Sequence, residues 1–597
     1  MKDAATASYS KKGEAIVKMN HDAIDAGAKA IVEVPVPAEW ADAETESLFV
    51  EAKGDNKPLV DYINNVQNYV NGQEGNALKV SDLVPYVDGH MPLGASAFEK
   101  RGVAVDVPSW NPDNCIQCNF CAYVCPHATI RPVAMTEEEA KAAPAATKTA
   151  DMTGMPGYKF AMTVTVLDCL GCGSCVNICP GKKGEKALTM AGLDSQRDQQ
   201  EVYDYGQKLP AKEEVLAKFK ADSVKGSQFR QPMLEFSGAC AGCGETPYAK
   251  LITQLFGERM YIANATGCSS IWGGSAPATP YTTNAKGQGP AWANSLFEDN
   301  AEFGLGMFTG QNTLREQTKE KVVALAESTD NADVKAAAAE YLDTYADGSK
   351  NGAATDKLVA ALEACGCDAA KEILAKKEFL SKKSQWIFGG DGWAYDIGFG
   401  GVDHVLASGE DVNVFVFDTE VYSNTGGQAS KSTNLGAIAQ FQAAGKGTKK
   451  KDLAAIAMSY GYVYVAQIAM GADYNQTVKA IAEAEAYPGP SLVIGYAPCI
   501  NHGIKGGMKI AQTEEKKAVT SGYWNLFRFN PTLAAEGKNP FHLDSKAPTT
   551  EYEDFIMGEV RYNALSRQNP ERAKELFAEA KANAEAKYNR LKDMSDK

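Results

Sequence analysis

The stretch Gln385-Trp-Ile-Phe-Gly-Gly-Asp-Gly-Trp393 indicates the fold of the largest part of this chain. Its apolar run ends in a glycine turn that carries one carboxylate. A second apolar run ends in a polar loop, in Val412-Asn-Val-Phe-Val-Phe-Asp-Thr-Glu-Val-Tyr-Ser-Asn424. Two parallel strands that end side by side would bring together Asp391, Thr419 and Asn424, oxygen ligands of the kind that Mg²⁺ prefers. The glycine turn would offer backbone N–H groups to a diphosphate. The alternative is a pair of ordinary Gly-rich turns in an α/β domain.

Strand and helix patterns alternate over residues 211–597, which predicts an α/β domain with a doubly wound parallel sheet. In such a sheet the functional residues lie beyond the carboxyl ends of the strands. Residues 311–384 interrupt the alternation with Ala-rich helix and are interpreted as an insertion. The candidate strands are Met260–Ala263, Gln385–Phe388, Val412–Phe417, Tyr462–Gln467 and Ser491–Tyr496, and four of them are followed by Cys268, Asp391, Asn424 or Cys499.

Eight of the fourteen cysteines lie in two runs with the same spacing, C-x2-C-x2-C-x3-C-P. This is the spacing of bacterial two-cluster ferredoxins, in which the fourth cysteine of each run binds the other cluster. The pattern predicts a ferredoxin-like α+β domain over residues 101–210 with two [4Fe–4S] clusters. Zinc is the competing interpretation, but zinc needs neither the third cysteine nor the Cys-Pro pair. The first cluster would use Cys115, Cys118, Cys121 and Cys179, and the second Cys169, Cys172, Cys175 and Cys125.

A third group of cysteines belongs to the predicted sheet domain. Cys240 and Cys243 form a C-x2-C pair, which alone could be a redox pair or half of a zinc site. Cys268 and Cys499 follow predicted strands, so the fold could bring them to the same edge of the sheet. Spacing alone therefore makes a third [4Fe–4S] site plausible and leaves the alternatives open. Cys365 and Cys367, in the insertion, are interpreted as bystander thiols.

Composition excludes several classes of function. The 597 residues allow several domains, and a hydrophobic content of 44% is that of a globular protein. A formal net charge of −15 without a long basic run argues against nucleic acid as a partner. No secretory signal and no apolar segment of membrane-spanning length is visible, so we expect no membrane contact and a cytoplasmic location. Cysteines in that compartment favour metal binding over disulfides.

The first hundred residues carry little chemical signature. Residues 1–45 combine helix with the Pro-containing linker Val32–Trp40, and they are too few to bury a core. They are interpreted as the tail of a truncated preceding domain. Residues 46–100 are predicted to form a small α+β spacer domain.

Several motifs together give a resemblance that covers nearly the whole chain. The GDG turn followed about thirty residues later by an Asn resembles the thiamine-diphosphate motif. Taken in order, the motifs resemble those of the pyruvate:ferredoxin (flavodoxin) oxidoreductases. They are Glu99-Lys-Arg101, the double-ferredoxin run, Cys240-x2-Cys243-Gly-Glu245, Ala265-Thr-Gly-Cys268-Ser269, Gly390-Asp-Gly-Trp393, Asp418 to Gln428, and Tyr496-Ala-Pro-Cys499.

The resemblance implies roles for individual residues. Mg²⁺ would contact Asp391, Thr419, Asn424 and the carbonyl of Val421, and Asn424 would also lie near the substrate as the catalytic residue. Asn20 would contact coenzyme A. A proximal [4Fe–4S] cluster would be held by Cys240, Cys243, Cys268 and Cys499. The implied thiamine-diphosphate site comprises Glu245, Cys268, Gly390, Asp391, Gly392, Trp393, Thr419, Glu420, Val421, Tyr422, Ser423 and Asn424.

The implied activity is oxidative decarboxylation of pyruvate with coenzyme A to acetyl-CoA and CO₂. Electrons would pass one at a time through three [4Fe–4S] clusters to ferredoxin or flavodoxin. The chain resembles only the C-terminal half of the single-chain family members. We therefore expect the chain to need the N-terminal half, with most of the coenzyme A site, either as a second chain or because this chain is a fragment, and we expect a homo-oligomer of the complete enzyme. The alternatives are an electron-transfer module without its own catalysis and an oxidoreductase for another 2-oxoacid.

Overall fold

The computed structural model describes residues 1–42, 51–274 and 277–596. They fall into two compact units, Met1–Glu51 and Ala52–Lys597, so the boundary expected between residues 45 and 46 lies outside the described residues. In the first unit, α1 (Lys2–Tyr9) and α2 (Glu14–Lys29) form a hairpin and bury no side chain. Asn20 lies on α2, where its amide donates to the carbonyl of Ile16 at 2.8 Å.

An eight-stranded sheet forms the centre of the second unit, with the strand order β13-β12-β10-β11-β9-β8-β6-β7. Its six strands from β10 to β7 are parallel, whereas β12 and β13 are antiparallel at one edge. The doubly wound parallel sheet is thereby confirmed, and the antiparallel edge is an addition. The strands are β6 (Met260–Ala265), β7 (Ala291–Ser295), β8 (Ser384–Gly390), β9 (Asn413–Asp418), β10 (Tyr464–Ile468), β11 (Ser491–Tyr496), β12 (Phe527–Phe529) and β13 (Phe541–Leu543).

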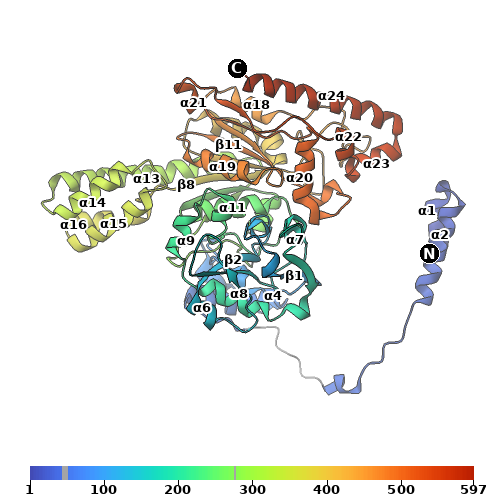
Figure 1. Ribbon diagram of the computed structural model, residues 1–597, viewed down its shortest axis with the longest axis horizontal. Coiled ribbons are helices and arrows are strands. Elements are labelled where there is room, and N and C mark those ends of the chain that lie inside the picture. The colour runs from blue at the N-terminus through green and yellow to red at the C-terminus, as the bar shows by residue number, and fades with distance from the viewer. Residues whose placement is uncertain (43–50, 275–276, 597) are drawn as a thin grey trace. The chain divides into compact units, whose positions relative to one another are not determined.

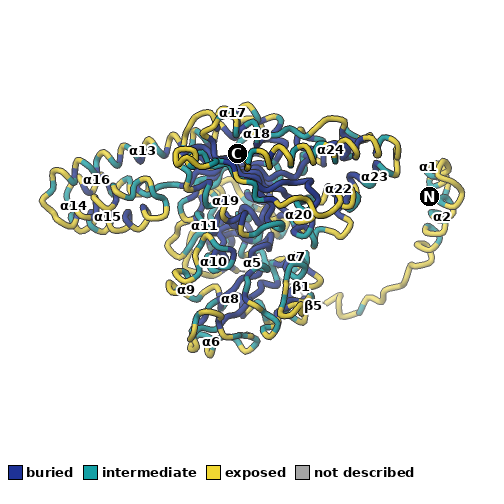
Figure 2. Tube along the Cα trace, turned by 45° about the horizontal axis from the view of Figure 1, so that its top comes forward, coloured by how far each residue is buried: buried dark blue, intermediate teal, exposed yellow. Residues whose placement is uncertain are grey.

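The sheet is buried on both faces, which explains its continuous apolar strands. Alternate residues of β9 belong to separate cores: Val414 and Val416 to one, Phe415 and Phe417 to the other. Figure 2 shows buried backbone at the centre of this domain and exposed residues on its outer helices. One face is covered by α13 (Asn300–Ser328), α17 (Phe399–Ala407), α18 (Leu453–Met458), α23 (Val560–Gln568) and α24 (Pro570–Ser595), and the other by α10 (Val224–Ser227), α11 (Thr246–Phe256), α12 (Cys268–Gly274) and α19 (Tyr474–Ala486).

The cysteine-run region folds around two small antiparallel sheets. One pairs β1 (Asp106–Trp110) with β5 (Leu188–Gly192). The other contains β2 (Ile130–Thr136), β4 (Tyr158–Val164) and β3 (Ala150–Asp151), with Thr136 opposite Tyr158. The helices of this region and its extension toward the sheet domain are α5 (Phe120–Tyr123), α6 (Glu137–Ala142), α7 (Ser174–Ile178), α8 (Gln199–Lys208) and α9 (Glu213–Lys218). This is the α+β arrangement that the cysteine spacing predicts.

The insertion is a helical arm that projects from the sheet domain (Figure 1). It comprises the end of α13, α14 (Ala332–Asp343), α15 (Asn351–Cys365) and α16 (Asp368–Leu374), which have a core of their own. Away from the arm, at the other side of the sheet domain, are α20 (Ala511–Thr520) and α22 (Tyr552–Ile556). The short helix α21 (Thr532–Ala535) lies between β12 and β13 in the chain. No helix of the described residues is both long enough and apolar enough to span a membrane.

The α+β character predicted for residues 46–100 is wrong in the described part of that range. Between residues 51 and 100 the structure has α3 (Lys57–Tyr62), α4 (Asn68–Asn71) and short turns of helix, and no strand. The side chain of Asn56 caps α3, and Pro58 occupies its first turn. Both features stabilise the start of a helix here.

Candidate thiamine and iron–sulfur sites

Cysteines from both runs line a small cavity in the ferredoxin-like domain. The backbone N–H groups of Gln117 and Ala187 donate to two of the sulfurs, Cys115 Sγ and Cys179 Sγ, each at 3.4 Å. Hydrogen bonds to sulfur stabilise thiolates and tune the potential of a cluster. The lining cysteines are Cys115, Cys118, Cys121 and Cys179, the set expected for the first cluster.

A second group gathers around Cys175. Burial raises the pKa of the Cys175 thiol well above its usual range, and the nearby thiols of Cys172, Cys125 and Cys169 raise it further. The Gly171 N–H donates to Cys169 Sγ at 3.4 Å. Buried thiols with raised pKa values need a bound cation to exist as thiolates, so this group fits iron ligation. It combines Cys125 of the first run with three cysteines of the second.

A larger cavity lies where β6, β9 and β11 end. The Gly244 N–H donates to the carbonyl of Pro498 at 3.2 Å, and a Cβ on Gly244 would lie 2.6 Å from the nitrogen of Pro498. Only glycine therefore allows the two cysteine loops to pack this closely. The lining includes Cys240, Cys243, Cys268 and Cys499 together with Glu245, Trp272, Thr419 and Asn424.

Glu245 is the buried carboxyl of this cavity. Its side chain is 4% exposed, and Trp272 Nε1 donates to its Oε2 at 2.7 Å. Burial raises the pKa of Glu245 to about 7. The carboxyl can therefore hold or release a proton near neutral pH.

Asp391 is bound by the loop that follows β9. Its Oδ1 accepts from the N–H of Thr419 at 3.2 Å and from the Thr419 hydroxyl at 2.9 Å, and its Oδ2 accepts from Ser430 at 2.5 Å. The Thr419 hydroxyl also lies 3.0 Å from the carbonyl oxygen of Val421. Burial and the neighbouring Asp418 raise the pKa of Asp391 well above its usual range, a cost that a divalent cation would offset. The donor set is all oxygen, which fits Mg²⁺.

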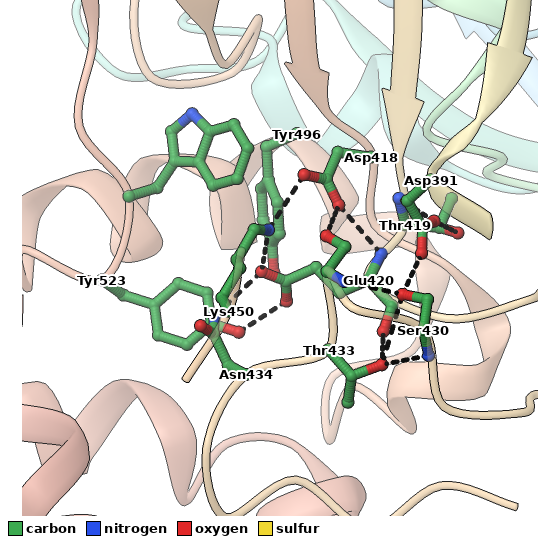
Figure 3. A network of polar contacts seen from close by, with 12 residues as sticks. Asp391, Asp418, Thr419, Glu420, Ser430, Thr433, Asn434, Lys450, Tyr496 and Tyr523 are labelled. Atoms are coloured by element: carbon green, nitrogen blue, oxygen red, sulfur yellow. Dashed lines mark hydrogen bonds and ion pairs between the residues drawn. The ribbon is translucent and has the colours of Figure 1, made fainter. Parts of the chain in front are cut away.

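A buried ionic network lies beside the Asp391 loop (Figure 3). Lys450 Nζ lies 2.9 Å from Asp418 Oδ2 and 2.9 Å from Glu420 Oε1. Glu420 also accepts from the hydroxyl of Tyr523 at 2.5 Å and pairs with Arg561 at 2.8 Å. Glu420 has a positive φ of 60°, an unfavourable conformation that these contacts hold in place.

The predicted site residues therefore separate into groups. Glu245, Cys268, Thr419 and Asn424 line the large cavity, where Asn424 is exposed and its side chain has no hydrogen-bond partner among the described residues. Trp393 instead packs in the core against Gly389 and Gly398. Glu420 is fully buried and pairs with Lys450 and Arg561. Gly390, Asp391, Gly392, Val421, Tyr422 and Ser423 form the turn and loop between these groups.

Sequence reasoning missed the residues that support the loop. His502 is fully buried, and its Nε2 lies 2.7 Å from the carbonyl oxygen of Thr419. Ser430 directly follows the motif that ends at Gln428, whereas Lys450 lies further along the chain and Tyr523 and Arg561 come from distant segments. The polar run Ser430–Asn434 after the motif is the one signal that could have indicated part of this support.

The described residues contain no group of three His, Cys, Asp or Glu side chains that could hold a single metal ion. Thiolates with backbone N–H donors are the ligands that four-iron clusters use, so the chemistry of all three cysteine groups fits such clusters.

Three family models match parts of the chain. Residues 114–183 match a 4Fe-4S dicluster domain, and residues 360–494 match the C-terminal TPP-binding domain of thiamine pyrophosphate enzymes. Residues 51–104 match EKR, a domain of unknown function. Thiamine pyrophosphate and [4Fe–4S] clusters are thus the cofactors of the matched domains.

Curated relatives match over nearly the entire chain. It is 52% identical over 590 residues to the pyruvate-flavodoxin oxidoreductase of Klebsiella pneumoniae, covering 98% of this chain and 50% of that protein. It is 52% identical over 606 residues to the pyruvate:ferredoxin oxidoreductase of Moorella thermoacetica, covering 100% of this chain and 51% of that protein. This chain is similar to half of a pyruvate oxidoreductase. It spans about half the length of the pyruvate oxidoreductases that it matches.

Two further matches share less sequence identity with this chain. Pyruvate dehydrogenase [NADP(+)] of Euglena gracilis is 45% identical over 592 residues, 98% of this chain and 32% of that protein. A solved structure of 2-oxoglutarate:ferredoxin oxidoreductase from Magnetococcus marinus shares 14% identity and covers 56% of this chain and 86% of that one. Its TM-score of 0.29 is too low to compare the folds in detail.

Proposed function

We propose that this chain is the thiamine- and iron–sulfur-carrying half of an enzyme that oxidatively decarboxylates pyruvate with coenzyme A to acetyl-CoA and CO₂. The observation that carries the proposal is the large cavity. Thr419 and Asn424 of the thiamine motif line it together with the four cysteines of the third group. A thiamine enzyme that oxidises its substrate needs an electron acceptor beside the cofactor, and this cavity provides ligands for both.

The chain would hold Mg²⁺ and thiamine diphosphate through its own oxygen atoms. The Thr419 hydroxyl lies within hydrogen-bond distance of Asp391 and of the carbonyl of Val421. Asn424, which lines the cavity, would be the fourth ligand of the Mg²⁺. Bound thiamine diphosphate supplies the electron sink that decarboxylation of a 2-oxoacid requires. Glu245 would keep a proton on Oε1, because Trp272 occupies Oε2.

The three cysteine groups would hold three [4Fe–4S] clusters, which carry one electron each. The loop of the third group contacts the ferredoxin-like domain directly. The backbone of Gly242 forms a hydrogen bond with Cys172 that lowers its pKa against the effect of burial. His127, two residues after Cys125, lies with Nε2 at 3.2 Å from the carbonyl oxygen of Cys240. These contacts fix the geometry between the thiamine side and the two-cluster side.

Ferredoxin or flavodoxin would be the electron acceptor, as the names of the relatives state for those proteins. The remaining length of those relatives would contribute the rest of the pyruvate and coenzyme A sites as a partner polypeptide. Asn20 would be this chain's contact with coenzyme A. The complete assembly would be a cytoplasmic homo-oligomer.

The test combines this chain with the polypeptide that corresponds to the rest of the relatives' length, and titrates thiamine diphosphate with and without Mg²⁺. We expect Mg²⁺-dependent binding, and pyruvate-dependent reduction of ferredoxin that requires coenzyme A. Asp391→Asn should abolish the Mg²⁺ dependence, whereas Asp396→Asn, on the following turn, serves as the control. Absence of thiamine binding would leave an electron-transfer module instead. Faster turnover of 2-oxobutyrate or 2-oxoglutarate than of pyruvate would mean that another 2-oxoacid is the substrate of the same site.

A further inference from the structure

Helix α11 connects the large cavity with the ferredoxin-like domain. It begins directly after Glu245 and carries Lys250 near its middle. The Lys250 side chain is 2% exposed. Its Nζ donates to the carbonyl oxygens of Ala122 and, at 2.9 Å, of Tyr123.

These carbonyls belong to α5, a single turn that lies between the ligand sets of the two ferredoxin-type clusters. Cys121, within α5, lines the first cavity, and Cys125, two residues after α5, belongs to the second group. Both thiols act electrostatically on the Lys250 ammonium. The ammonium therefore lies close to both proposed clusters of this domain.

The charge of Lys250 lacks a carboxylate partner among the described residues, which is unusual for a fully buried lysine. Arg131, the other buried cation that acts on it, is paired with Glu235. Burial lowers the pKa of Lys250 to about 8, and the Cys125 and Cys121 thiols oppose that effect. An uncompensated buried charge is costly, and the Cys125 and Cys121 thiols are the groups whose charge favours the ammonium form. Thiolates on iron would provide that charge.

We propose that Lys250 is a positioning residue for electron transfer, whose ammonium favours the reduced state of the two ferredoxin-type clusters. When one of these clusters accepts an electron, its negative charge increases by one. A fixed positive charge in a poorly screened interior stabilises that state. Lys250 thereby draws electrons from the cluster on Cys240, Cys243, Cys268 and Cys499 toward the outer pair. The inference rests on the proposed function only for the presence of the clusters.

The experiment is a redox titration of the full chain, loaded with iron and sulfide under anaerobic conditions and followed by electron paramagnetic resonance. It needs neither pyruvate nor thiamine diphosphate. Lys250→Gln keeps an N–H donor and removes the charge, whereas Lys250→Arg keeps the charge. Lys335→Gln, an exposed position on α14, is the matched control for losing one lysine.

We expect Lys250→Gln to lower the equilibrium constant for one-electron reduction of the ferredoxin-type clusters at least tenfold, which is about 59 mV. The Lys250→Arg and Lys335→Gln variants should keep the wild-type potentials. Wild-type potentials in Lys250→Gln would overturn the inference. If Lys250→Gln fails to hold its clusters, Lys250→Arg decides, because a tenfold loss with the charge retained would also overturn it. A wild-type chain that binds no ferredoxin-type clusters would overturn the proposed function as well.

Discussion

Replacing Lys450 by methionine tests whether the buried network holds the thiamine loop. The substitution leaves Asp418 and Glu420, both 0% exposed, without the ammonium that bridges them. Glu420 remains paired with Arg561. The lost ion pair therefore leaves mainly Asp418 without a compensating charge, although Asp418 still accepts hydrogen bonds from Tyr395 and Ser432. Removing one partner of a buried pair costs about 3–5 kcal/mol. Because the Lys450 side chain is 15% exposed, we expect the lower end, about 3 kcal/mol.

The same substitution should weaken cofactor binding. The positive charge of Lys450 lowers the pKa of Asp391 against the larger effects of burial and Asp418. Without that charge, Asp391 holds its proton more tightly and competes less well for Mg²⁺. The affinity for thiamine diphosphate in the presence of Mg²⁺ should therefore fall, and more at pH 6 than at pH 8.

The assay is urea unfolding followed by tryptophan fluorescence, to which Trp386 and Trp393, both fully buried in the sheet domain, contribute. Lys449→Met, at the exposed neighbouring position, is the control and should change the free energy of unfolding by less than about 0.5 kcal/mol. Adding Asp418→Asn to Lys450→Met should recover part of the loss, because it removes the uncompensated carboxylate. A loss in Lys450→Met no larger than in Lys449→Met would refute the reasoning.

Three further predictions concern iron, pH and packing. The loaded chain should contain about twelve irons, and Cys268→Ser about eight, because one four-iron cluster is lost; an unchanged iron content would exclude Cys268 as a ligand. Burial raises the pKa of Glu515 to about 8, above the value of about 4.3 in an unfolded chain, so folding stability should fall as pH rises between these values. In urea unfolding, the free energy of unfolding of Glu515→Gln should fall less between pH 5 and pH 8 than that of the wild type. The same pH dependence in both proteins would contradict the raised pKa of Glu515. Gly389→Ala places a Cβ 2.3 Å from the Trp393 ring and should cost about 1–3 kcal/mol of unfolding free energy, whereas Gly400→Ala, whose Cβ meets no atom within 4 Å, should not destabilise.

The sequence carried enough information to predict the parallel sheet because its strands are long apolar runs. Ser491–Tyr496 was predicted with its observed bounds, and the run before Asp418 lies within one residue of β9. The antiparallel edge was missed because β12 and β13 have three residues each, too few for a pattern. Cysteine spacing indicated a ferredoxin-like domain, because the positions of the ligands in such runs are set locally.

The buried ionic network around Lys450 could not be predicted from the sequence for a different reason. Lys450 and Arg561 carry no motif, and the motif that contains their partners Asp418 and Glu420 indicates cofactor binding and not ion pairing. Which charges pair in a core depends on tertiary packing, and neither hydrophobic pattern nor spacing reports it. The same holds for Trp393, which belongs to the motif but packs in the core against Gly389 and Gly398.

The contact between Gly244 and Pro498 has a consequence for how the protein is made. All eight cysteines of the ferredoxin-like domain leave the ribosome by residue 179, whereas the third group is complete only with Cys499. Since chains fold from the N-terminus as they are synthesised, the outer iron sites can mature on a nascent chain. The third group can assemble only after β11 has joined the sheet. If it binds iron, its site would therefore be the last of the three to be completed as the chain is made.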